Sequence, residues 1–126
     1  MTLEFSDLET IQDSALKRFD ERMARADCEN SGAVERELLR LESQLEQLYS
    51  LTAALARREA DVERTADLWG RLVKACDAFA GRAYHLSQRH ACATTSYDTI
   101  LDIRSAAEEL RALHSHDSSR GNRPTG

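Results

Sequence analysis

An all-α fold is predicted for this chain by three observations. Apolar residues recur every seven positions from Val34 to Ala83, which is the repeat of a helix with one apolar seam. Charged residues make up 31 % of the 126 residues, and they are mixed with abundant Ala and Leu, as is typical of long helices. The single proline is Pro124, so no proline interrupts the preceding sequence. The length suits one helical domain, placed at residues 1–114, with a tail at residues 115–126.

The first predicted helix is short and starts at Ser6. Ser6 and Glu9 have the spacing of a capping box, in which each side chain accepts a backbone N–H of the first turn. Apolar residues then follow at intervals of three and four, and define one face of the helix. We expect the helix to end near Asp27, and a polar turn to follow in which Asn30 or Ser31 caps the next helix.

The second predicted helix is long and carries the heptad repeat. No stop signal appears before His90, so the sequence favours one continuous helix of about 58 residues, roughly 87 Å long. The polar stretch from Arg57 to Asp67 is its weakest part. A break there is the alternative, and would give four helices that close into a self-sufficient bundle. One row of the repeat is Val34, Leu41, Leu48, Leu55, Val62, Trp69, Cys76 and Ala83, and the other is Leu38, Leu45, Thr52, Glu59, Ala66, Val73 and Ala80.

The third predicted helix is short and follows a turn at residues 92–96. Thr95 and Asp98 resemble another capping box, and apolar residues from Ile100 to Leu113 mark one face. From Ser115 onward the sequence contains no apolar side chain of any size, which predicts a disordered tail.

These lengths predict how the helices associate. Short turns make neighbouring helices antiparallel, so each short helix would fold back along one half of the long helix in an antiparallel coiled coil or bundle. The apolar face is narrow before Arg57 and wide after Thr65, where a second row of apolar residues joins the seam. The wide face is too large for one short helix. We therefore expect the chain to need helical partners or a second copy of itself.

The residues predicted to bind that partner lie on the seam and on the wide face. Trp69 marks the point where the seam widens, and a buried tryptophan there fits the core of an assembly. The predicted set is Leu38, Leu41, Leu45, Leu48, Leu55, Leu68, Trp69, Leu72, Val73 and Phe79.

The sequence offers little for catalysis, metals or nucleic acids. His85 and His90 are five residues apart, which is a poor spacing for metal ligands on a helix, and Cys92 would lie at a helix end that disfavours a thiolate. We therefore predict no enzyme activity and no cofactor. Basic residues are interleaved with acidic ones at a net charge of -5, so we expect no nucleic acid partner.

The expected location is the cytoplasm, without an integral membrane segment. No apolar run reaches 18 residues, and the acidic start from Met1 to Asp13 does not suit a secretory or mitochondrial leader. Three cysteines in unrelated contexts fit reduced thiols.

In its helix lengths and heptad seam, the chain is similar to two kinds of small helical protein. One is the small coiled-coil subunit of a larger cytosolic assembly, as in trafficking, tethering or kinetochore complexes. This resemblance implies a non-catalytic subunit or adaptor that acts through helix packing. The other is the flagellar or type III export chaperone, which implies that a client segment binds in a helical groove.

Overall fold

The computed structural model describes residues 5–25 and 30–122, with only the backbone described for Phe5 and for 115–122. Over these residues the chain forms four helices and no strand, so the predicted all-α fold is confirmed. The predicted end of the first helix at Asp27 lies outside the described residues. The helices are α1 (Phe5–Arg25), α2 (Ser31–Arg58), α3 (Val62–Ser87) and α4 (Ala91–Asn122).

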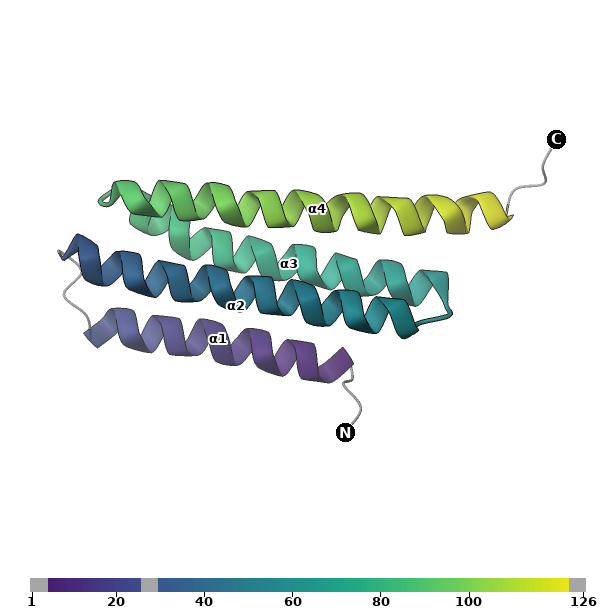
Figure 1. Cartoon of the computed structure of the whole chain (residues 1–126), viewed down its shortest axis with the longest axis horizontal. Helices are drawn as coiled ribbons and strands as arrows, with labels where there is room; N and C mark the ends of the chain where they lie inside the picture. Colours follow the sequence, from purple (N-terminus) through teal and green to yellow (C-terminus); the bar gives the residue numbers. More distant parts are fainter. Residues whose placement is uncertain (1–4, 26–29, 123–126) are drawn as a thin grey trace.

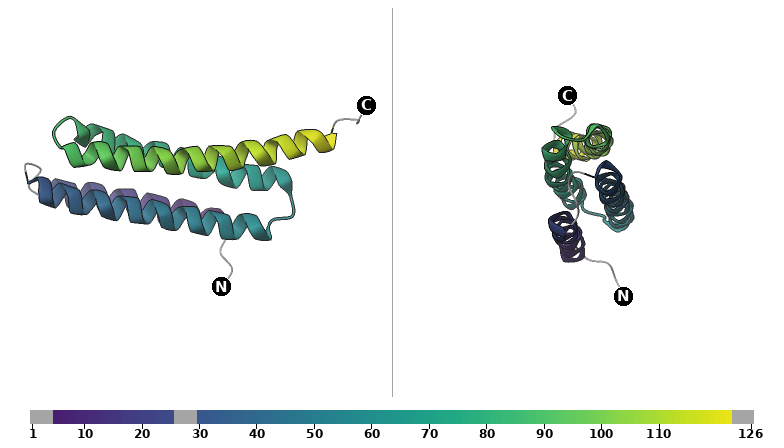
Figure 2. Two further views of the ribbon diagram at one scale, coloured as in Figure 1. Left: turned by 45° about the horizontal axis from the view of Figure 1, so that its top comes forward. Right: turned by 90° about the vertical axis from the view of Figure 1, so that its left-hand side faces the viewer.

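The four helices form an elongated bundle in which each helix runs antiparallel to the one before it (Figure 1). As a result α1 is parallel to α3, and α2 is parallel to α4. The end-on view in Figure 2 shows α1 and α4 at opposite corners, with α2 and α3 between them. Accordingly α2 packs on all three other helices, whereas α1 packs mainly on α2 and only lightly on α3.

The prediction of one continuous helix from residue 33 to residue 90 is wrong. The chain turns at residues 59–61, inside the polar stretch identified as its weakest part. Asp61 caps α3 by accepting the backbone N–H of Glu63 at 2.9 Å, and the Glu59 carboxylate accepts the N–H of Asp61 at 3.1 Å. The turn lets the apolar stripes of α2 and α3 face each other, and their burial outweighs the helical hydrogen bonds lost at the turn.

The start of α4 also differs from the prediction. α4 begins at Ala91, so Thr95 and Asp98 lie inside a helix and do not cap it. The turn lies earlier because His90 is buried there, and its Nδ1 lies 3.1 Å from the Ser31 hydroxyl at the start of α2. This tertiary contact is not visible in the local sequence.

At its other end α4 continues as helix through residues 115–122, where the sequence predicted a disordered tail. Neither proline nor a helix-ending turn precedes Gly121, so the local sequence does not force the helix to stop at residue 114.

The core runs the length of the bundle and is built mainly from the predicted stripes of α2 and α3, with further buried residues from α1 and α4. α3 and α4 approach each other most closely, because small side chains line their contact. Ala83, Ala93 and Ala107 are completely buried there. The wide face of α3 is thus covered by helices of the same chain. This arrangement is the four-helix bundle that the sequence allowed as the alternative to one continuous helix. The wide face of α3 therefore does not require another chain to cover it.

Candidate partner-binding groove

The residues predicted to bind a partner lie inside the bundle. Nine of the ten are at most 4 % exposed, and Leu55 is half-buried against the core. They contact other helices of the same chain, so a partner reaches them only if the helices separate. The nine buried residues are Leu38, Leu41, Leu45, Leu48, Leu68, Trp69, Leu72, Val73 and Phe79.

Trp69 belongs to this internal core. Its ring lies 5.3 Å from that of Tyr49 on α2, in a tilted arrangement typical of aromatic pairs. Its indole N–H is buried and donates no hydrogen bond within the described part of the chain. Trp69 therefore packs between α3 and α2 and is not exposed at the surface.

The seam between α1 and α3 is built differently, because two exposed ion pairs span it. Glu9 pairs with Arg71. Asp20 receives two hydrogen bonds from Arg82, from Nη2 at 2.9 Å and from Nε at 3.2 Å. The pairs are eleven residues apart on both helices, which is three helical turns, so α1 and α3 run parallel and in register. Exposed pairs of this kind contribute about 0.2–1 kcal/mol each, so the two helices are joined only weakly here.

Beside the Asp20–Arg82 pair, α1 and α3 leave a hollow of about 600 Å³ between them. Its apolar lining comes from Phe19, Met23 and Ala24 on α1 and from Leu86 on α3. Polar and small residues complete it, namely Asp20, Gly81, Arg82, His85, Gln88, Arg89 and His90.

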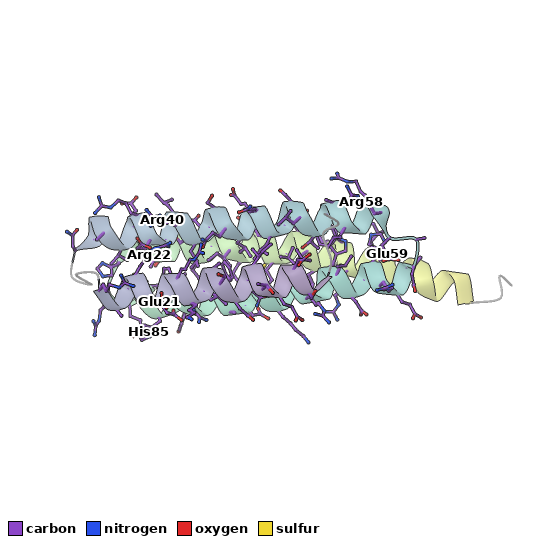
Figure 3. All side chains as sticks on the ribbon, turned by 90° about the horizontal axis from the view of Figure 1, so that it is seen from below. Glu21, Arg22, Arg40, Arg58, Glu59 and His85 are labelled. Atoms are coloured by element: carbon purple, nitrogen blue, oxygen red, sulfur yellow. The ribbon has the colours of Figure 1, made fainter. Side chains whose placement is uncertain are left out.

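A second hollow, of about 520 Å³, lies along the α1 side of the same seam. The two hollows share Asp20, Ala24 and Arg82, so we treat them as one feature, the α1–α3 groove. Figure 3 labels Glu21 and His85, which lie toward the same end of the bundle on α1 and α3. The second hollow is lined by Asp13, Leu16, Lys17, Asp20, Glu21, Ala24 and Arg82.

Gly81 leaves space in this groove. A Cβ atom added to Gly81 would have no neighbour within 4 Å, whereas one added to Gly70, on the same helix, would lie 3.5 Å from Cδ of Arg111. Gly81 has no positive φ that would require glycine. Alanine would favour the helix by about 1 kcal/mol at such a position. Glycine at residue 81 therefore makes α3 less stable than alanine would, and neither a close contact nor the backbone conformation requires it.

The two rims of the groove differ in charge. The α1 rim is mainly acidic, with Asp13 and Glu21, while the α3 rim is basic, with His85 and Arg89. The side chains of His85 and Arg89 are exposed and form no ion pair or side-chain hydrogen bond with the described residues. The groove thus has an apolar floor between an acidic and a basic edge, which suits an amphipathic segment of opposite charge pattern.

The residues considered for metal or thiol chemistry do not come together. Within the part of the chain that the structure describes, no group of three or more His, Cys, Asp or Glu side chains is placed to hold a metal ion. Cys76 is fully buried, and burial, with a smaller effect of Asp77, raises the pKa of its thiol to about 12. His90 lies beside the Ser31 hydroxyl, and Cys92 is half-buried in the first turn of α4.

The groove was missed by the sequence analysis. Its position depends on how closely α1 approaches α3, which no local pattern reports. Gly81, which lies inside α3, is one local signal, but Gly70 in the same helix carries the same signal and does not line the groove.

None of the four helices, over the residues described, combines the length and the apolar character that a membrane crossing demands. No family model, no curated protein and no solved structure matches this chain.

Proposed function

We propose that this chain is a non-catalytic helical subunit or adaptor, which binds a helical segment of another protein in the α1–α3 groove. One observation carries the proposal. The groove has an apolar floor between an acidic and a basic edge, and Gly81 in its lining costs helix stability although alanine would fit there. A helix packed into this groove would make the coiled-coil or bundle type of contact expected of such a subunit.

The charges of the rims define the segment that fits. An amphipathic helix that enters the groove would bury an apolar stripe against Met23 and Leu86. Basic residues on one side of its stripe would meet Glu21, and acidic residues on the other side would meet Arg89. Exchanging the acidic and basic positions of the segment would place like charges together and weaken binding.

An export chaperone is the second candidate, because the same groove would accept the terminal segment of a client. The two functions differ in the bound protein. An adaptor binds a segment of a folded complex, whereas an export chaperone binds a client that is unfolded or held for secretion.

The test uses two synthetic helical peptides with the same apolar stripe. One carries the complementary charge pattern and the other carries the exchanged pattern. Titration followed by amide NMR should show binding of the first peptide, with shifts at Met23, Gly81 and Leu86, and at least about tenfold weaker binding of the second.

Gly81→Leu should abolish binding while the bundle remains folded, because the leucine side chain would fill open space. Gly70→Ala serves as the matched control on the same helix and should bind normally. Equal binding of both peptides, or unchanged binding by Gly81→Leu, would contradict the proposal.

A further inference from the structure

The heptad register continues across the α2–α3 turn without a change of phase. The positions from Val34 to Leu55 in α2 and from Trp69 to Ala83 in α3 belong to one uninterrupted series of sevens. Two helices joined by a turn can bury their apolar stripes without sharing one heptad register. In a straight helix, the same register would place the buried stripes of both helices on a single face.

The turn contains neither glycine nor proline, and its only helix-starting signal is the Asp61 cap of α3. It consists of Glu59, Ala60 and Asp61, and Glu59 and Asp61 have ordinary extended dihedral angles. The seam positions on either side are poorly covered, because Leu55 is only half-buried and Val62 is 39 % exposed. The folded monomer therefore leaves the seam incomplete where the chain turns.

The contacts that join the two halves of the bundle are formed by residues of the helices on either side of the turn, such as Tyr49 with Trp69. The α1–α2 hairpin is tied to the α3–α4 hairpin by the Asp20–Arg82 pair, by the Ser96 hydroxyl bonded to Glu42 at 3.0 Å, and by the core. These contacts would be identical if the two hairpins belonged to different copies of the chain. Only the turn would have to change.

We propose that this chain also forms a symmetric dimer in which the α2–α3 turn opens. In each copy, α2 and α3 become one helix from Ser31 to Ser87, roughly 86 Å long, and each α1–α2 hairpin packs on the α3–α4 hairpin of the second copy. The two long helices run antiparallel, as α2 and α3 do in the monomer. Leu55 and Val62 then lie on a continuous seam. This inference does not depend on the groove or on its proposed partner.

A proline at residue 62 separates the two forms. Val62 is the first residue of α3, where proline is favoured, and Asp61 before it has the extended backbone that proline requires. The Asp61 cap bonds the N–H of Glu63, so Val62→Pro removes no hydrogen bond of the cap. Inside a continuous helix the same proline is strongly unfavourable.

Purified protein is refolded from denaturant at millimolar concentration and then analysed by size-exclusion chromatography with light scattering. The wild type should give a dimer besides the monomer. Val62→Pro should remain folded and reduce the dimer fraction at least about 100-fold, since proline interrupts both long helices. Val62→Ile, the matched control, should keep the dimer. A wild type without dimer, or a Val62→Pro protein with the wild-type dimer fraction, would overturn the proposal.

A charge exchange tests whether the hairpins change places. The variants Asp20→Arg and Arg82→Glu each place like charges together in the monomer and in their own swapped homodimers. When the two variants are refolded together, a swapped heterodimer restores an attractive pair at both sites. Native mass spectrometry should show heterodimer in about 3- to 10-fold excess over random pairing. Random pairing would mean that the dimer forms through another surface, and would refute the exchange of hairpins.

Discussion

Two neighbouring leucines on α2 provide a direct test of where the core lies. Leu41 is completely buried, whereas Leu39, two residues earlier, is 55 % exposed. Both are in the same helix and have the same helix propensity. Replacement of each by alanine therefore isolates the contribution of burial.

The expected loss for Leu41→Ala follows from its environment. The change removes three carbon atoms from a fully buried site, which at about 0.8 kcal/mol per group amounts to about 2.4 kcal/mol of transfer free energy. The remaining cavity can raise the total to about 5 kcal/mol. With an unfolding entropy of about 2.1 cal/mol/K per residue, this loss lowers the Tm by about 10–20 °C. Leu39→Ala should change the free energy of unfolding by less than about 0.5 kcal/mol.

Urea denaturation followed by circular dichroism at low micromolar concentration measures both values. A ten-fold dilution should leave the Leu41→Ala loss unchanged, because the monomer buries this side chain. A loss below about 1 kcal/mol would show that Leu41 is not enclosed by its own chain. If dilution removed the difference in stability between Leu41→Ala and the wild type, the apolar seam of α2 would be filled by another molecule.

Three further predictions concern the cap of α2, the buried thiol and the α1–α3 seam. Asn30→Ala should destabilise the protein by about 0.5–2 kcal/mol in chemical denaturation, because the Asn30 side chain accepts two backbone N–H groups of the first turn, and Asn30→Asp should retain most of this stability. The Cys76 thiol should resist a disulfide reagent at pH 8 until the protein unfolds. The pKa of this thiol is about 12 in the folded protein, above its ordinary value of 9.0. The stability that the protonated thiol contributes is therefore complete below pH 9 and is lost as pH rises toward 12. Over this range the free energy of unfolding should fall less steeply in Cys76→Ala than in the wild type. Arg82→Ala should reduce stability by no more than about 1 kcal/mol, and 0.5 M salt should remove most of the difference, since the pair with Asp20 is exposed; a large salt-independent loss would contradict this assignment.

The sequence predicted the all-α fold and the buried side of the helices, because apolar periodicity reports which side of a helix is buried, but it did not predict where α2, α3 and α4 begin and end. It also identified Asn30 as a candidate cap, and the structure confirms that the Asn30 side chain accepts backbone N–H groups of α2. The break at residues 59–61 was not favoured, because a heptad series reads the same whether the helix continues or folds back on itself. The choice depends on the burial gained by facing stripes, which is a tertiary quantity.

The groove and the start of α4 were not predictable for a related reason. Thr95 and Asp98 have the pattern of a cap, yet the contact of His90 with Ser31 places the turn earlier. The two residues are 59 positions apart, so their contact is not visible in the local sequence. The groove likewise results from the relative placement of α1 and α3, which lie far apart in the chain.

The long sequence separation between α1 and α3 has a consequence during protein synthesis. The Glu9–Arg71 and Asp20–Arg82 pairs each join residues that are 62 positions apart. A ribosome that adds about 5–20 residues per second needs roughly 3–12 s to make the second partner after the first. Until then Leu8 and Phe19, which are buried in the finished protein, have no α3 to pack against. The nascent first helix is therefore a candidate substrate for a ribosome-associated chaperone.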